Sequence, residues 1–160
     1  MGKNTVLLFT FFSFMAYTLD FISYAPLAPG IINDMGFTYT QSGFIVSLTS
    51  LIYLVFMIPM GMLCDKWGGR RILILGLAMM GLSTLAFPFS PSYGIILITR
   101  AFLGIGGAAL ITSSIKLVSV EFLPSEQDKA FGIWGMGWGV GLLAVFFLMP
   151  VIARDFGWET

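Results

Sequence analysis

Long apolar runs separated by short polar links dominate this chain. No charged residue occurs between Gly43 and Leu63 or between Ile72 and Phe89. Each run is long enough to cross a hydrocarbon core about 30 Å thick as a helix, which rises about 1.5 Å per residue. The pattern recurs along the chain and predicts five membrane-spanning helices, at residues 5–28, 40–63, 72–89, 93–120 and 130–153.

Polar residues in the first two predicted helices gather on one side of each helix. Successive residues of a helix are about 100° apart around its axis. One narrow sector of the first helix therefore holds Thr10, Ser13, Tyr17, Asp20 and Tyr24, and one face of the second holds Ser42, Thr49 and Tyr53. We expect these stripes to face protein or water, because lipid would leave their hydrogen-bonding groups unsatisfied.

Prolines and glycines predict where helices end and how they pack. Pro26, Pro29 and Gly30 are expected to stop the first helix and to start a loop that reaches Tyr39. Thr40 is the expected N-cap of the second helix. Small residues recur in the last predicted helix, at Gly132, Gly135, Gly137, Gly139 and Gly141. They allow close approach, so we expect protein to cover at least one side of this helix.

The composition supports a membrane protein and narrows its class. Hydrophobic residues make up 58% of the chain and charged residues 10%, and the mean hydropathy is +0.94. The apolar runs are too long for the roughly ten-residue alternating strands of a membrane barrel. Helices are the other way to satisfy the backbone in lipid. The expected fold class is therefore an all-α integral membrane protein with a lipid bilayer as its surroundings.

Several other classes of function lack support in the sequence. The formal net charge is zero, which gives no electrostatic basis for nucleic-acid binding. The single cysteine, Cys64, and the absence of histidine give no disulfide and no metal site. The stretch Gly139 to Ala144 fits the dinucleotide pattern G-x-G-x-x-A, but no strand-turn-helix unit surrounds it. We expect no enzyme activity, no metal and no cofactor.

Lysine and arginine residues lie unevenly at the ends of the predicted helices. One side holds Lys3, Lys66, Arg70, Arg71, Lys116 and Lys129, and the other holds Arg154 alone. The positive-inside bias therefore predicts a cytoplasmic N-terminus and a cytoplasmic link at residues 61–71, with the tail from Arg154 outside. The N-terminal run lacks a signal-type cleavage site, so it is expected to be the first span. The expected location is the cell inner membrane, which the chain crosses several times.

Two motifs carry a resemblance to a known family. Residues 61–71 resemble the loop between helices 2 and 3 of the major facilitator superfamily, roughly G-x-L-x-D-[RK]-x-G-[RG]-[RK]-[RK]. The matching residues are Gly61, Leu63, Asp65, Lys66, Gly68, Arg70 and Arg71. Residues 100–108, RAFLGIGGA, are similar to the family's helix-4 signature R-x-x-x-G-x-G-x-[AG]. The resemblance implies a transporter of twelve spans in two six-helix halves, of which this chain holds the first five helices.

The resemblance also implies roles for the link at residues 61–71. In the family, Asp65 and Arg70 would belong to a cytoplasmic gating latch that holds the two halves together. The simpler interpretation is topological, with Lys66, Arg70 and Arg71 fixing the orientation of the helices. The latch requires the missing C-terminal half as its partner.

Asp20 and Arg100 are charged residues well inside predicted spans, and such residues are functional candidates. Counting about 1.5 Å per residue places both in the outer half of the membrane, about one turn apart in depth, so they could pair. Resemblance to proton-coupled sugar transporters implies that Asp20 accepts the proton and that Arg100 controls its proton affinity. The alternative is a static buried pair that fixes the first helix against the fourth.

The neighbouring polar residues suggest a substrate pocket between the first, second and fourth helices. Its expected lining is Tyr17, Tyr24, Thr49, Tyr53 and Arg100. Each hydroxyl could instead serve helix packing. Trp134 and Trp138 could face either a pocket or lipid. A fainter resemblance of residues 20–26, 34–36 and 41–43 to anion:cation symporters implies an organic anion such as a sugar acid. That branch usually has Asp-Arg where this chain has Asp20-Phe21, so Arg100 would supply the positive charge.

Together these patterns predict a secondary active transporter that moves a small solute, a sugar or an organic anion, by alternating access with protons. The chain is expected to be its N-terminal fragment. The alternatives are a non-transporting membrane fragment, a helix-packing or assembly module, and a half-size transporter that dimerises, which five spans disfavour.

Overall fold

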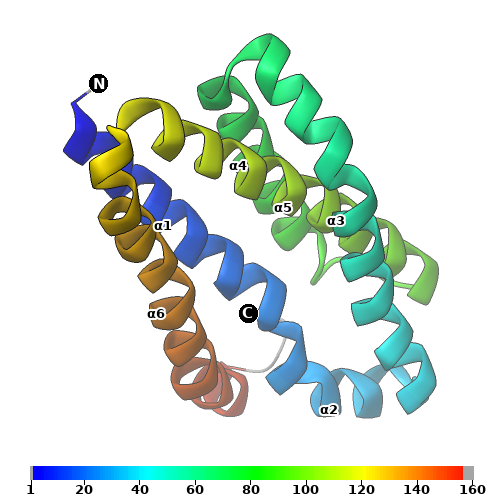
Figure 1. Cartoon of the computed structure of the whole chain (residues 1–160). Helices are drawn as coiled ribbons and strands as arrows, with labels where there is room; N and C mark the ends of the chain where they lie inside the picture. The colour runs from blue at the N-terminus through cyan, green and yellow to red at the C-terminus, as the bar shows by residue number, and fades with distance from the viewer. Residues whose placement is uncertain (1, 157–160) are drawn as a thin grey trace.

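The structure, a computed structural model, describes the backbone of residues 2–156 and the side chains of residues 2–152. It consists of six helices, and the described residues contain no strand (Figure 1). The predicted all-α class is confirmed. The helices are α1 (Lys3–Ile22), α2 (Tyr24–Met35), α3 (Tyr39–Trp67), α4 (Gly69–Ala86), α5 (Tyr93–Glu121) and α6 (Pro124–Phe156). Five stretches are long and apolar enough to span a membrane, with α1 and α2 forming one of them.

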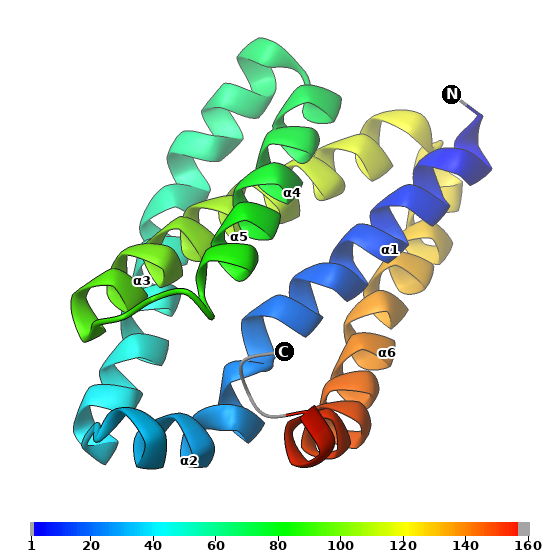
Figure 2. The ribbon, with the colours of Figure 1, turned by 180° about the vertical axis from the view of Figure 1, so that it is seen from behind.

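Helix α5 lies at the centre of the bundle (Figures 1 and 2). In its apolar stretch 61% of the residues are buried, against 17–33% in the other four spans. Close approach explains part of this burial. A Cβ atom on Gly104 of α5 would lie 2.7 Å from the Thr49 carbonyl oxygen of α3, so only glycine allows this contact. Helix α5 is therefore the element on which α1, α3 and α4 are positioned.

Helices α1 and α6 form a second tightly packed pair, side by side in both views (Figures 1 and 2). A Cβ atom on Gly137 of α6 would lie 2.6 Å from the Phe11 carbonyl oxygen of α1. The expectation that the glycine-dense last helix packs against protein is thus confirmed, with α1 as the main neighbour.

The first predicted helix, 5–28, is wrong in its C-terminal part. Helix α1 ends at Ile22, and after Ser23 the separate helix α2 continues to Met35, inside the predicted loop. Pro26 explains the break, because its ring conflicts with the carbonyl four residues earlier, at Ile22. It does not stop α2, because it lies in the first turn, where a missing N–H leaves no hydrogen bond unmade.

The next helix begins earlier than predicted. Thr38, and not Thr40, is the N-cap of α3. Its hydroxyl accepts a hydrogen bond from the Gln41 amide, and the Gln41 side chain accepts one from the Thr38 amide. Such a capping box stabilises a helix start by about 1 kcal/mol. The sequence signal was the spacing of Thr38 and Gln41, with a polar side chain three residues after the cap.

The link at residues 61–71 is not an extended surface turn. Helix α3 continues through it to Trp67, and α4 starts at Gly69, so Gly68 alone separates them. Gly68 has φ +86°, a left-handed conformation that favours glycine. The polar link at 121–129 is also mostly helical, with Phe122 and Leu123 between α5 and α6, because Pro124 suits the first position of α6. Helix α4 ends at Ala86 instead of Phe89, since Pro88 has no N–H to continue the helical hydrogen bonds.

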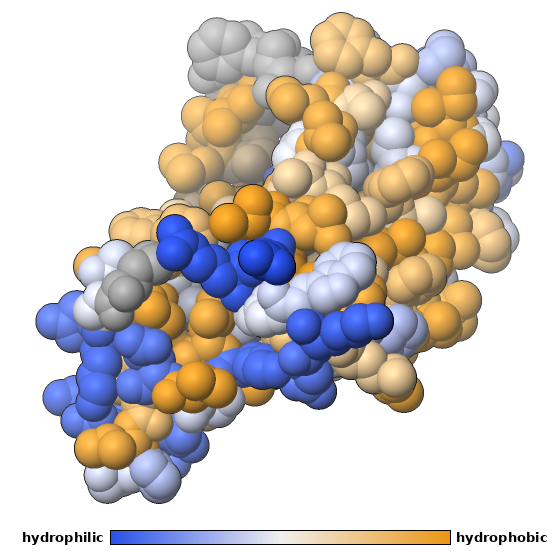
Figure 3. Space-filling view, turned by 90° about the horizontal axis from the view of Figure 1, so that it is seen from above, coloured by the Kyte–Doolittle hydropathy of each residue, from blue (hydrophilic) through white to orange (hydrophobic). Residues whose placement is uncertain are grey.

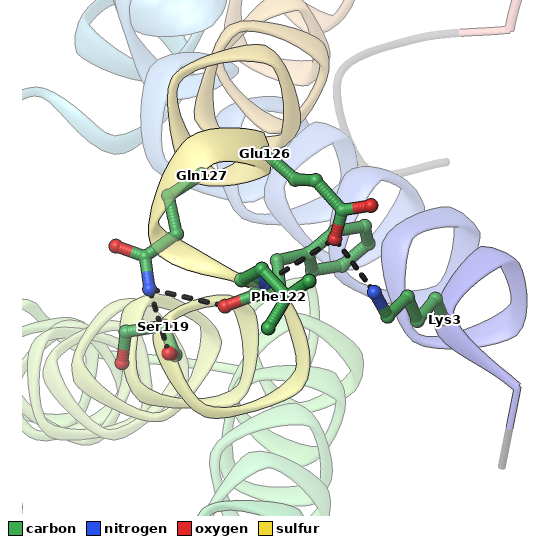
Figure 4. A network of polar contacts seen from close by, with 6 residues as sticks. Lys3, Ser119, Phe122, Glu126 and Gln127 are labelled. Atoms are coloured by element: carbon green, nitrogen blue, oxygen red, sulfur yellow. Dashed lines mark hydrogen bonds and ion pairs between the residues drawn. The ribbon is translucent and has the colours of Figure 1, made fainter.

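Polar and charged side chains gather at one end of the bundle (Figure 3). Lys3 Nζ lies 2.6 Å from Glu126 Oε2, and the same oxygen accepts a hydrogen bond from the Leu123 amide. Gln127 Nε2 donates to the Ser119 and Phe122 carbonyls (Figure 4). These contacts tie the start of α1 to the α5–α6 link, at the same end as the α3–α4 turn (Figure 1). Arg154, expected at the opposite side, and the tail to Thr160 lie outside the described side chains.

Candidate functional site

A cavity of about 180 Å³ contains both charged residues singled out in the spans. We call it the Asp20 cavity. Asp20 comes from α1 and Arg100 from α5. Residues of α4 and Met149 of α6 contribute to the other walls of the cavity. The full lining is Leu19, Asp20, Ser23, Leu27, Ser83, Thr84, Phe87, Pro88, Arg100, Leu103 and Met149. Asp20 is half-buried, so its carboxyl lies on the wall of an accessible space.

Arg100 is buried between two aromatic rings. Its guanidinium carbon lies 4.3 Å from the centre of the Phe87 ring and 4.9 Å from that of Tyr24. Only 7% of the residue is exposed, and its Nε atom has no hydrogen-bond partner. A guanidinium held over ring faces gains cation–π stabilisation, which reaches about 2 kcal/mol where water is excluded. The rings thus stabilise a positive charge deep in the bundle.

The structure brings Asp20 and Arg100 to one cavity but does not join them directly. Among the described side chains, ion pairs link Lys3 to Glu126 and Lys116 to Asp65, and none links Asp20 to Arg100. The static buried pair considered from the sequence is therefore not formed here. The physical reason is that Phe87 and Tyr24 hold the guanidinium, a contact that counting depth along helices does not reveal.

Tyr17 and Tyr53 line a different cavity, of about 380 Å³, which we call the aromatic cavity. Its other lining residues are Phe14, Phe21, Ser50, Leu54, Ile111 and Trp138. The centre of the Tyr17 ring lies 5.3 Å from the centre of the Phe21 ring and 6.1 Å from the ring centres of Tyr53 and Trp138. It packs directly on Gly107 of α5, where a Cβ atom would be 2.6 Å from its ring.

Tyr24 and Thr49 lie between the two larger cavities. With Arg100 and Phe21 they line a space of only about 10 Å³, which is about the size needed for one water molecule. The Tyr24 hydroxyl lies 2.9 Å from Ser42 Oγ, and Thr49 Oγ1 donates to the Ile45 carbonyl. The one pocket expected from the sequence is thus divided in two, with these hydroxyls bonded between or within helices.

Sequence reasoning missed most of the aromatic side chains of the site. Phe14 and Phe21 lie three residues before and four residues after Tyr17, on the same face of α1. A search for aromatic residues at this spacing would have found them, whereas the search for polar residues did not. Phe87 lies outside the helices, and no sequence signal connects it to Arg100.

The residues of the predicted gating link occupy the polar end but contact different neighbours. Lys116 Nζ of α5 bonds the Asp65 carboxylate and the Cys64 carbonyl. Arg70 lines a separate cavity of about 120 Å³ beside α1 and Leu117. Gly61 and Lys66 are helical residues of α3, Gly68 forms the turn, and Arg71 is exposed on α4. Asp65 thus has a partner in α5, Lys116, that lies 51 positions later in the sequence. The sequence did not indicate this contact.

No group of three or more histidine, cysteine, aspartate or glutamate side chains in the described part of the chain could hold a metal ion. The groups available for chemistry in the spans are therefore the Asp20 carboxyl, the Arg100 guanidinium and the hydroxyls around them.

Known proteins share both the sequence and the fold of this chain. The chain is 31% identical over 121 residues to Puromycin resistance protein pur8 of Streptomyces alboniger, covering 72% of this chain and 24% of that protein. It is 26% identical over 158 residues to Probable anion transporter 4, chloroplastic, of Oryza sativa subsp. japonica, covering 98% and 27%. The chain thus spans about a quarter of the length of these relatives.

The match extends to a solved structure. A bacterial homologue of the human lysosomal transporter Spinster, in an inward-facing and occupied conformation, has a TM-score of 0.86 with this chain. The two are 22% identical, and the match covers 95% of this chain and 33% of that one, which shows a common fold. The family model described as Major Facilitator Superfamily matches residues 6–160. The resemblance of the two sequence motifs is thereby confirmed, and the chain belongs to the major facilitator superfamily.

Proposed function

We propose that this chain is the N-terminal part of a secondary active transporter, which moves a small solute by alternating access and couples that movement to protons. The similarity to proteins named as transporters supports the general activity. In this proposal the rest of the protein supplies the sixth helix and a second half, and the solute crosses between the halves.

The observation that carries proton coupling is the position of Asp20. Its carboxyl lies inside a span on the wall of a cavity, without a direct ion pair, and a buried guanidinium lines the same cavity. A charged group at this depth is costly, and such a residue is by default a candidate for a function. The carboxylate takes up the proton, and any movement of α1 against α5 changes its distance from Arg100. Such a change alters the affinity of the carboxyl for a proton.

The polar end of the bundle supports the proposed orientation. Lys3, Lys66, Arg70 and Arg71 lie at the start of α1 and around the α3–α4 turn, at the end seen in Figure 3. The positive-inside bias assigns this end to the cytoplasm. Asp65 and Arg70 then face the side where the proposed latch to the second half would form.

When Asp20 carries the proposed proton, Arg100 is the charged group left in the Asp20 cavity, which favours an anionic over a neutral solute. Arg100 provides a positive group in the spans, and one relative is named as a probable anion transporter. An organic anion is therefore the proposed substrate, with sugars as the second choice.

Reconstitution of the complete protein encoded by the gene tests this proposal. An imposed pH gradient is expected to drive accumulation of an organic anion in proteoliposomes. Asp20→Asn should abolish accumulation and retain exchange, whereas Asp128→Asn, an exposed acid at the polar end, should change neither. If the folded complete protein moves no solute, a helix-packing module becomes the better interpretation. If Asp20→Asn still accumulates solute, Asp20 is not the coupling group.

A further inference from the structure

The aromatic cavity has a wall unlike the one that a sugar or a small anion requires. Five of its lining residues carry aromatic rings, and none of them carries a charge. The rings come from Phe14, Tyr17 and Phe21 of α1, Tyr53 of α3 and Trp138 of α6. Three helices therefore converge with ring faces and edges on one space beside α5.

Four of these rings keep surface that a ligand can reach. Tyr17 is buried, whereas Phe14, Phe21, Tyr53 and Trp138 are only half-buried. Ring centres are 5.7 Å apart for Phe14 and Trp138 and 6.3 Å apart for Phe21 and Tyr53. These separations are typical of packed aromatic pairs, and a ligand ring would contact such rings in an offset or edge-on arrangement.

The hydrogen-bonding capacity of the cavity is small. Its polar groups are the hydroxyls of Tyr17, Ser50 and Tyr53 and the indole N–H of Trp138, and the Ser50 hydroxyl already donates to the Val46 carbonyl. A sugar would leave several of its hydroxyls without partners, at a cost of about 1–3 kcal/mol for each buried group. A small hydrated anion would find no positive group in this wall.

We propose that the aromatic cavity binds a planar aromatic ring of the transported compound. The inference rests on the proposed transport function and specifies its substrate class as an aromatic compound, in place of a sugar or sugar acid. Phe21 connects the two parts of the site, because it also lines the small space next to Arg100. A negative group on the ring therefore faces the cationic side of the site.

Equilibrium dialysis of radiolabelled probes against the complete protein in lipid nanodiscs tests the inference. Benzoate and cyclohexanecarboxylate have the same charge and ring size, but only benzoate is planar. We expect benzoate to bind at least about threefold more tightly, the lower range of a ring–ring interaction. Glucuronate, a sugar acid, should bind more weakly than benzoate, and empty nanodiscs correct for partition into lipid.

Variants assign the binding to the cavity. Tyr53→Leu and Trp138→Leu should each weaken benzoate binding about three- to tenfold, because each removes one ring contact. Phe44→Leu is the matched control, since Phe44 lies on the same helix as Tyr53 but is 52% exposed on the outside. This control should bind benzoate as the unmodified chain does.

Several outcomes would overturn the inference. One is equal binding of benzoate and cyclohexanecarboxylate. Another is binding of glucuronate, or of the cationic probe tetramethylammonium, that is tighter than binding of benzoate. The others are no binding of any probe and unchanged benzoate binding in both cavity variants. Flux assays with the complete protein separate this inference from the transport proposal. Flux of a non-aromatic solute that Tyr53→Leu does not affect removes the aromatic site and leaves the transporter. Benzoate binding by a complete protein that moves no solute removes the transport proposal and leaves the aromatic site.

Discussion

The Asp20 cavity and the aromatic cavity both have walls from α1, α5 and α6, but their chemistry is opposite. The first holds a carboxyl and a guanidinium, and the second is lined by rings and has no charged side chain. On α1, Asp20 is about 60° around the helix axis from Tyr17, at about 100° per residue. A single helix thus turns a polar side toward one cavity and an aromatic side toward the other. The proton site and the substrate site proposed above therefore involve neighbouring sectors of α1, about 60° apart.

The strongest test of this comparison measures solute accumulation and benzoate binding in one variant of each cavity. Asp20→Asn should abolish accumulation driven by a pH gradient in the complete protein, but should leave benzoate affinity within about twofold, because no ring is lost. Tyr53→Leu should weaken benzoate binding. It should not change the accumulation of solute at a saturating concentration. Flux and dialysis on the same two variants measure both effects. Parallel loss of both readouts in either variant would show that the two cavities act as one site.

The aromatic cavity depends on the close contact between Gly107 and Tyr17. In Gly107→Ala the added methyl group would lie 2.6 Å from the Tyr17 ring, and we expect a loss of about 1–3 kcal/mol in stability. Gly81→Ala has open space around it and should gain up to about 1 kcal/mol from helix propensity. Thermal unfolding in detergent measures both. A Gly107→Ala protein as stable as Gly81→Ala would mean that Tyr17 moves aside freely.

The Asp20 cavity depends instead on the rings that hold Arg100. Phe87→Leu removes the nearer ring, and we expect a loss of about 0.5–2 kcal/mol. Phe89→Leu is the control, because Phe89 is 84% exposed. The same unfolding assay applies. Equal stability of the two variants would show that Phe87 contributes bulk alone and that the cation–π contact does not stabilise the bundle.

The smallest effect is expected outside both cavities, at the ion pair between Asp65 and Lys116. The Asp65 side chain is 77% exposed, so water and salt screen the pair. Asp65→Asn should cost at most about 1 kcal/mol at low ionic strength and nothing measurable in 1 M salt. Unfolding at the two salt concentrations checks this. A larger, salt-independent loss would place the pair in a less accessible environment than its exposure indicates.

The features set by one helix at a time could be predicted from the sequence. Span positions follow from apolar length, and counting residues along the first and fourth predicted spans placed Asp20 and Arg100 at similar depth. The cavity that contains both residues agrees with this estimate. The motif at residues 61–71 indicated the family that the comparisons confirm.

The features set by two helices together could not be predicted. The break at Ser23 turns α2 away from α1, so Tyr24 leaves the stripe of Tyr17 and meets Ser42 and Arg100 instead. Rotation of one helix relative to another decides which cavity a side chain enters, and a single sequence contains little information on it. The division of the expected pocket into two has this origin.

The turn at Gly68 also bears on how the nascent chain enters a bilayer. With one residue between them, α3 and α4 are joined closely at one end. In the proposed orientation the two helices insert as a hairpin, with Lys66, Arg70 and Arg71 at its cytoplasmic end. A side chain at Gly68 would strain this turn at φ +86° and so weaken the pairing of the two helices as they enter the membrane.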